Sequence, residues 1–333
     1  MEKVRWGVLS TAKIGVEHVI PALMKCKGSR LVAIASRDLA RARETADRFG
    51  IPNVHGSYEA LLADPEVQVI YNPLPNHLHV PWSEKAAERG KHVLCEKPIA
   101  LTAAEAQRLI EVRDRTGVLI QEAFMVRCHP QWQRARDLVR QGQIGDLRAV
   151  QTFFSYMNRD PKNIRNIFEI GGGAVYDIGC YPIVVSRFLF GEEPRRVVAL
   201  MERDPDMGID RLTSAILDFP SGHASFVCST QLAGHQRVEI LGTKGRIEVA
   251  IPFNAPADET TRIFLDSGAK PGGASAEVET IEAVDQYTLQ ADLFSQAIRN
   301  GGGLAFPLED SVKNMRVIDA VYRSAQNGAW EEV

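Results

Sequence analysis

Residues 4–15, VRWGVLSTAKIG, decide the fold of the first half of the chain. They open with a short apolar run at 4–9, which is typical of a buried strand. The chain then turns, takes up helical spacing of apolar residues at 14–26, and enters a second apolar run at 31–35. A strand, a helix and another strand in this order predict a β-α-β unit with parallel strands.

The same alternation continues to about residue 124 and then stops. Further helices are expected at 38–49, 58–62, 79–89 and 102–116, with strands at 67–71, 92–95 and 118–121. Beyond residue 124, strands follow one another directly, joined by the turn sequences PSG (220–222) and GTKG (242–245). Helices are expected there near 131–140, 287–298 and 308–327. We therefore predict an α/β protein with an N-terminal doubly wound parallel (Rossmann) sheet and a C-terminal α+β domain. The first should span residues 1–124, and the second, with a large and mostly antiparallel open sheet, residues 125–333.

Composition excludes several classes of function. Among 333 residues, 39 Lys and Arg balance 42 Asp and Glu to a net charge of -3, so a basic surface for nucleic acid or anionic membranes is not expected. The five cysteines lie far apart without a C-x-x-C pair, which favours free thiols over disulfides or a metal site. The start resembles no leader peptide, and no apolar run approaches the ~20 residues that cross a bilayer. We expect a cytoplasmic protein without membrane or nucleic-acid partners.

The turn after the first strand occupies the place of the G-x-G-x-x-G dinucleotide fingerprint. Only its third glycine, Gly15, is present, while Ser10 and Ala12 replace the first two. Both are small, and the Ser10 and Thr11 hydroxyls can donate to a phosphate at the helix N-terminus. We expect Ser10, Thr11, Ala12 and Ile14 to bind a dinucleotide, although an ordinary strand-to-helix turn remains an alternative.

The end of the second strand indicates which nicotinamide cofactor fits. An acidic residue there would hold the 2′-hydroxyl of NAD, whereas this chain has Ser36 and Arg37, with Arg41 one turn later. A hydroxyl and guanidinium groups suit the 2′-phosphate of NADP. Asp38 can serve either as a helix N-cap or as the ribose carboxylate. We predict NADP(H) in preference to NAD(H).

Two motifs are candidates for the catalytic chemistry. Glu96, Lys97 and Pro98 end a predicted parallel strand, where ligands bind in such sheets. After the glycines of 171–173, Asp177 and Tyr181 are four positions apart, a spacing that puts them on one helix face. A tyrosine, with its usual pKa near 10, is a poor base unless a cation favours its phenolate. Lys97 beside Tyr181 would supply that cation, and Asp177 would orient the substrate or the lysine.

These residues resemble the Gfo/Idh/MocA oxidoreductases. The similarity covers nearly the whole chain and is carried by GKHVLCEKP (90–98), GGGAVYDIG (171–179), LPN (74–76) with His79, EAFM (122–125), HPQ (129–131), NIR (163–165) and QY (286–287). Tyr181 stands where the inositol-dehydrogenase branch has histidine, so the chain is closer to the tyrosine branch with dimeric dihydrodiol dehydrogenase, xylose dehydrogenases and glucose–fructose oxidoreductase.

The resemblance implies hydride transfer between a nicotinamide and a sugar, cyclic polyol or diol, with Lys97 at the catalytic centre. It also implies a homodimer or homotetramer formed through the C-terminal sheet, and cofactor contacts from Leu74, Pro75, Asn76, His79 and Glu96. We place Arg127, Arg165 and Tyr287 at the substrate, although they could instead reach the cofactor or form only structural pairs.

Two other functions remain open. His77, His79 and Cys95 are conceivable zinc ligands, but other metal-ligand spacing is missing, so we expect no metal. Relatives of this fold that have lost turnover act as NADP-binding regulatory proteins. Because Lys97, Asp177 and Tyr181 are all present, the sequence favours the enzyme.

Overall fold

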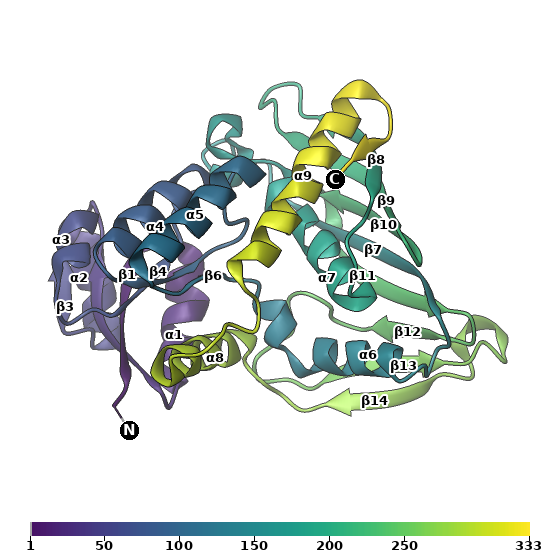
Figure 1. Cartoon of the computed structure of the whole chain (residues 1–333), viewed down its shortest axis with the longest axis horizontal. Helices are drawn as coiled ribbons and strands as arrows, with labels where there is room; N and C mark the ends of the chain where they lie inside the picture. The colour runs from purple at the N-terminus through teal and green to yellow at the C-terminus, as the bar shows by residue number, and fades with distance from the viewer. Residues whose placement is uncertain (1) are drawn as a thin grey trace. The chain divides into compact units, whose positions relative to one another are not determined.

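The computed structural model describes residues 2–333, which form two compact units (Figure 1). The first unit contains the chain up to Met125 together with Gln286–Met315, and the second contains Val126–Asp285 and Arg316–Val333. The expected division after residue 124 accounts for the first of these segments, but it does not account for the return of residues 286–315 to the first unit.

The first unit is built on a six-stranded parallel sheet in the order β3-β2-β1-β4-β5-β6. Its strands are β1 (Val4–Leu9), β2 (Ser29–Ala35), β3 (Asn53–His55), β4 (Val69–Asn72), β5 (His92–Cys95) and β6 (Ile120–Glu122). Its helices are α1 (Ile20–Lys25), α2 (Leu39–Phe49), α3 (Tyr58–Ala63), α4 (His79–Glu88), α5 (Ala103–Thr116) and α8 (Gln286–Asn300). This order, with the strand sequence reversing beside β1, confirms the doubly wound parallel sheet that the alternating periodicity predicts.

Helix α8 belongs to the first unit because it packs on the core of the parallel sheet. The indole of Trp6, fully buried in β1, meets the ring of Phe294 edge-on at 5.8 Å between centroids. Trp6 Nε1 also donates to Ser295 Oγ at 3.1 Å, and that oxygen lies 2.8 Å from the hydroxyl of Ser29 in β2. The buried indole N–H of Trp6 therefore has its hydrogen-bond partner in α8, which helps to hold residues 286–300 against the sheet.

The second unit is built on a nine-stranded sheet in the order β14-β13-β12-β11-β7-β10-β9-β8-β15. Its strands are β7 (Leu147–Met157), β8 (Arg196–Arg203), β9 (Asp210–Phe219), β10 (Gly222–Ser229), β11 (Gln231–Gly242), β12 (Arg246–Val249), β13 (Thr261–Asp266), β14 (Glu277–Ile281) and β15 (Glu331–Glu332). Between the described strands only the β7–β10 pair is parallel, which confirms the expected large, mostly antiparallel sheet.

Helices cover one face of this second sheet. Helix α6 (Pro130–Arg140) packs on β12 and β13, and α7 (Cys180–Phe190) packs on β7 (Figure 1). Helix α9 (Leu308–Asn327) begins in the first unit and ends in the second. Along β7, Val150, Thr152 and Phe154 are buried under the helices, whereas Gln151 and Phe153 point to the other, part-exposed face. This alternation is the period-two pattern of a sheet with one covered face.

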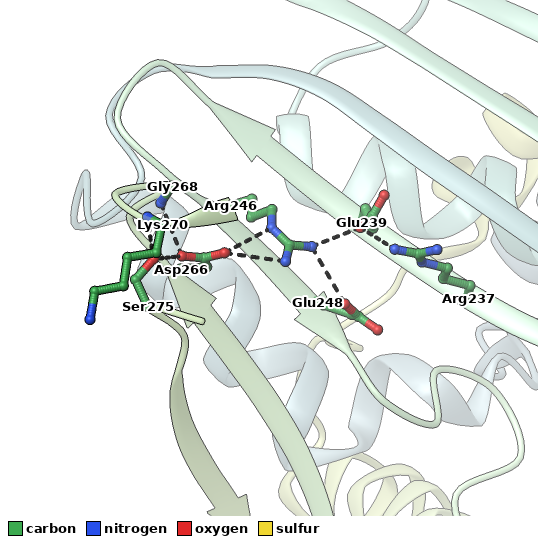
Figure 2. A network of polar contacts seen from close by, with 8 residues as sticks. All are labelled: Arg237, Glu239, Arg246, Glu248, Asp266, Gly268, Lys270 and Ser275. Atoms are coloured by element: carbon green, nitrogen blue, oxygen red, sulfur yellow. Dashed lines mark hydrogen bonds and ion pairs between the residues drawn. The ribbon is translucent and has the colours of Figure 1, made fainter. Parts of the chain in front are cut away.

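Charged side chains link three adjacent strands of this sheet (Figure 2). Glu239 of β11 and Glu248 of β12 are directly opposite one another, which alone would be repulsive. The Arg246 guanidinium bonds both, at 2.8 Å and 3.5 Å, and also bonds Asp266 of β13 at 3.2 Å (Figure 2). One arginine therefore offsets the repulsion and links β11, β12 and β13 in their observed register.

Candidate active site

The predicted cofactor residues gather at the carboxyl edge of the parallel sheet, in the loops that follow β1, β2, β4 and β5. Parallel strands end at the same edge, and ligands of doubly wound sheets bind there. The loops come from four separate stretches of the chain and bring Ser10, Arg37, Asn76 and Lys97 to one side of the unit.

In the turn after β1, Ser10 adopts a backbone conformation that glycine normally supplies. Its φ is +70°, and its Oγ accepts a hydrogen bond from Ala12 N–H at 3.2 Å. A π-helical turn, Gly15–Val19, follows and leads into α1. A Cβ at Gly15 would meet its nearest neighbour, Tyr71, at 3.7 Å, which is an ordinary contact. Ser10 therefore takes a left-handed conformation at the position of the fingerprint's first glycine.

After β2 the structure separates the roles of Arg37 and Asp38. Asp38 is the N-cap of α2, and its Oδ1 accepts from the N–H groups of Ala40 and Arg41 at 3.1 and 3.2 Å. Ser36 Oγ in turn accepts from Asp38 N–H at 3.1 Å. Arg37 is exposed and hydrogen-bonds Tyr58; burial raises the pKa of Tyr58, whereas this guanidinium lowers it. From the sequence, Asp38 could either cap the helix or bind a ribose. In the structure its carboxylate caps α2.

The loop after β4 is held from within the protein. Asn72 Oδ1 accepts from Leu74 N–H at 3.3 Å, and Pro75 leads into the short 3-10 turn Asn76–Leu78. His79, 1% exposed, places Nε2 2.6 Å from Leu74 O and Nδ1 2.7 Å from Pro98 O. Burial lowers the pKa of His79 to about 4, while these two carbonyl contacts oppose that shift and Lys97 adds to it. The ring therefore connects the loop after β4 to the loop after β5.

The loop after β5 carries Lys97, and several buried groups fix it. Ile99 N–H donates to Glu122 Oε1 at 2.8 Å, next to the Pro98 carbonyl that His79 contacts. Glu96 Oε1 accepts from Tyr71 O–H at 2.7 Å. Burial, and to a smaller extent the Glu96 carboxylate, raise the pKa of Tyr71, so its hydroxyl stays protonated and donates. The Lys97 side chain itself is part-buried. The segment Glu96–Pro98 is thus held on both sides.

In the second unit, Asp177 is the centre of a polar cluster. Arg165 Nε donates to its Oδ1 at 2.9 Å, and Tyr156 O–H donates to its Oδ2. The Asp177 carboxylate is the main cause of a raised pKa for Arg165; for Tyr156, burial contributes most to a raised pKa and Asp177 adds to it. Asp177 is thus a charged acceptor between two donors that stay protonated at neutral pH.

Tyr181 lies next to this cluster on the same stretch of chain. Asp177 belongs to the π-helical turn Val175–Gly179, and Tyr181 belongs to the first turn of α7. The ring of Tyr181 is 6% exposed and packs on Phe154 and Phe253, with centroids 5.8 and 5.3 Å away. Tyr181 also contributes to the raised pKa of Arg165. The four-residue spacing therefore crosses from a π turn into an α-helix.

Sequence reasoning missed Tyr156, which contacts Asp177 directly. The signal was its place on β7, where the alternation of Val150, Thr152 and Phe154 puts Tyr156 on the helix-covered face. Of the other predicted residues, Arg127 is buried at 3% exposure, with its backbone carbonyl bonded by Gln133. Tyr287 stacks on His18 of the π turn before α1, at 5.3 Å between ring centroids.

Comparison with known proteins gives the family. Residues 4–124 match a family described as "Oxidoreductase family, NAD-binding Rossmann fold", and residues 132–248 match the GFO/IDH/MocA C-terminal domain. The chain belongs to the GFO/IDH/MocA oxidoreductases. This confirms the resemblance drawn from the motifs, and the protein is an NAD(P)-dependent oxidoreductase.

Similar members of the GFO/IDH/MocA family match over nearly full length. An uncharacterized oxidoreductase of Rhizobium meliloti is 54% identical, with 100% of both chains covered. D-xylose 1-dehydrogenase (NADP(+)) 2 of Haloferax volcanii is 38% identical over 98% of this chain and 99% of its own. The crystal structure of KijD10, a 3-ketoreductase from Actinomadura kijaniata in complex with NADP and TDP-benzene, superposes with a TM-score of 0.91 at 31% identity, covering 97% and 98% of the two chains.

All five cysteines are buried free thiols, as their spacing predicts. Within the described part of the chain, no group of three or more His, Cys, Asp or Glu side chains could hold a metal ion. Nor does any helix in it have the length and apolar character to cross a membrane.

Proposed function

We propose that this oxidoreductase transfers hydride between NADP(H) and a hydroxyl- or carbonyl-bearing carbon of a sugar, cyclic polyol or diol. In this proposal Lys97 and Tyr181 act on one substrate oxygen. The observation that carries it is the support of Lys97: buried His79, Glu122 and Tyr71 hold its loop at the edge of the sheet where ligands bind.

The preference for NADP rests on the loop after β2. Arg37 is exposed at the end of the strand, and the only carboxylate nearby in sequence, Asp38, is engaged in capping α2. A guanidinium without a competing ribose carboxylate favours a 2′-phosphate. A xylose dehydrogenase that is 38% identical carries NADP(+) in its name, in agreement with this preference. When bound, the cofactor supplies a nicotinamide C4 that accepts or donates hydride.

The protein's own residues would manage the proton. In the oxidation direction Tyr181 acts as a phenolate, favoured by the Lys97 cation, and takes the proton of the substrate hydroxyl. Lys97 also stabilises the developing negative charge on the substrate oxygen. Asp177, held between Arg165 and Tyr156, would orient the substrate by accepting from a further hydroxyl. Arg127, Arg165 and Tyr287 stay candidates for substrate contacts. In the reduction direction the same groups act in reverse.

The test is a fluorescence screen with NADP and NADPH over pentoses, hexoses, ketosugars and cyclic diols, followed by Lys97→Ala and Tyr181→Phe. Each substitution should lower turnover by about a hundredfold or more and leave the Kd for NADPH nearly unchanged. Turnover at the wild-type rate in either variant would refute the assignment. Tight NADPH binding without turnover of any compound would instead indicate a regulatory protein.

We further propose that a second copy of the chain covers the open face of the nine-stranded sheet. That face has a hollow of about 630 Å³ lined by apolar side chains, including Leu200 at 78% and Ile216 at 44% exposure. Arg237 and Glu239 line it too, so the surface offers charges of both signs. An isologous pair places such a surface against its own copy, where opposite charges can meet.

A further inference from the structure

A buried carboxylate outside the candidate catalytic residues holds the start of the segment that carries Asp177 and Tyr181. Asp210, the first residue of β9, is 1% exposed. Its Oδ2 accepts from Val175 N–H, the first residue of the π turn, at 2.7 Å. Its Oδ1 accepts from Tyr322 O–H of α9 at 3.0 Å. A residue more than thirty positions away in the sequence thus caps this turn in place of a local side chain.

Gly173, just before the π turn, leaves room for the same carboxylate. Gly173 has a φ of +128°, and a Cβ at this position would overlap Asp210 Oδ1. Gly173 N–H donates to Arg165 O at 2.9 Å. Asp210 therefore contacts the turn that connects Arg165 to Asp177, and any side chain at position 173 would displace the carboxylate.

Burial of Asp210 favours the protonated, neutral form of its side chain. Burial raises its pKa to about 6, against the hydrogen bonds from Val175 and Tyr322 and the more distant Arg203. The other titratable groups that face it are Cys228 of β10 and, beyond Tyr322, Tyr176. An acid with a raised folded-state pKa binds its proton more tightly when folded, so its ionisation above that value costs stability.

We propose that Asp210 is a positioning residue, which fixes the glycine turn and the Val175–Gly179 segment so that Asp177 and Tyr181 are presented in a single geometry. The inference rests on the proposed function, in which Tyr181 passes the proton. Asp210 touches neither substrate nor cofactor in this scheme, and its effect reaches the reaction only through the backbone of the turn.

The test compares two substitutions of Asp210. Asp210→Ala removes both acceptors and should lower kcat about ten- to a hundredfold while KM and the Kd for NADPH change little. Asp210→Asn should restore kcat, because its amide oxygen can accept from Val175 and its amide nitrogen can donate to Tyr322. Equal kcat in wild type and Asp210→Ala, or equal losses in both variants, would overturn the proposal.

Asp204→Ala, in the loop between β8 and β9, is the matched control. Asp204 is also 1% exposed, but it accepts from Gln231 Nε2 at 2.8 Å and from the N–H groups of Asp206 and Met207. Because these hydrogen bonds lower the pKa of Asp204, its removal should reduce the free energy of unfolding. It should leave kcat unchanged, and a loss of kcat here as well would identify a general effect of destabilisation.

A second measurement does not depend on finding a substrate. Hydrogen exchange of the amides at 174–185 should accelerate in Asp210→Ala and in Gly173→Ala, and stay at the wild-type rate in Asp210→Asn. Unchanged exchange in both Ala variants would contradict the positioning role. If Tyr181→Phe keeps full turnover, the proposed function fails. If Tyr181→Phe is inactive and Asp210→Ala is fully active, the inference about Asp210 alone fails.

Discussion

Ser10 meets a backbone requirement that the family fingerprint usually meets with glycine. A left-handed φ costs a non-glycine residue about 1–2 kcal/mol, and the φ of Ser10 is +70°. The hydrogen bond from Ala12 N–H to its Oγ offsets part of that cost. A small polar residue can therefore adopt the left-handed conformation at the position where the fingerprint has its first glycine.

Arg37→Ala tests cofactor choice at a single side chain. Loss of a charge-assisted contact with the 2′-phosphate should weaken NADPH binding about ten- to a hundredfold and leave NADH binding nearly unchanged. Titration of both cofactors by fluorescence measures this ratio. Arg43→Ala, an exposed arginine on α2, is the control and should change neither Kd. Equal losses for the two cofactors would contradict the 2′-phosphate role.

His79→Ala tests how the loop of Lys97 is held. Without the ring, the carbonyls of Leu74 and Pro98 lose their partner in a site that is 1% exposed. The neutral ring has one N–H, so one of these buried carbonyls loses its donor and the packing of the ring is lost as well. The free energy of unfolding should fall by about 2–4 kcal/mol. Urea denaturation measures this change. His77→Ala, which removes a less buried ring two residues away, should cost far less; similar costs would argue against the clamp.

At the scale of elements, most helices and strands follow from local periodicity. The run at 4–9 and the helix at 308–327 end where the spacing predicts. Strand β3 escapes this reasoning because its three residues are too short for any period to appear. Strand β8 is not predicted although residues 197–201 form an apolar run, and most of its residues are exposed or part-exposed.

Helix α6 links stability to pH through its N-cap. His129 is 1% exposed, its Nδ1 accepts from Gln131 N–H at 3.2 Å, and burial lowers its pKa to about 4. Between this value and an unfolded pKa near 6.5, the unfolded chain binds the extra proton. The contribution of His129 to stability is therefore complete above about pH 6.5 and is lost as the pH falls toward 4.

His129→Asn keeps a capping acceptor and removes this titration. The slope of unfolding free energy against pH, measured by urea denaturation in that window, should become shallower by up to about 1.4 kcal/mol per pH unit. His223→Asn, whose side chain is 70% exposed, should leave the slope as in wild type. A His129→Asn slope equal to that of wild type would show that protonation of this ring is not coupled to unfolding.

At the scale of the whole molecule, the open sheet face predicts self-association. Leu200→Glu places a charge on the most exposed large apolar side chain of the proposed interface and should convert a dimer into a monomer. Light scattering at several protein concentrations measures the mass. Met24→Glu changes another exposed apolar side chain, 56% exposed and located on α1, and should not alter it. A monomeric wild-type protein would contradict the proposed pairing.

The sequence by itself determined most of the elements, the change from parallel to antiparallel pairing and the family, because apolar periodicity and turn residues are local properties. It also located Lys97, Asp177 and Tyr181 through short contiguous motifs. Only the tertiary structure decided that α8 returns to the first sheet, that Tyr156 bonds Asp177, and that Asp210, which accepts from Tyr322, caps the turn that carries Asp177. These contacts join residues far apart in the chain, and they depend on which polar groups are buried together and must find hydrogen-bond partners, which no local pattern records.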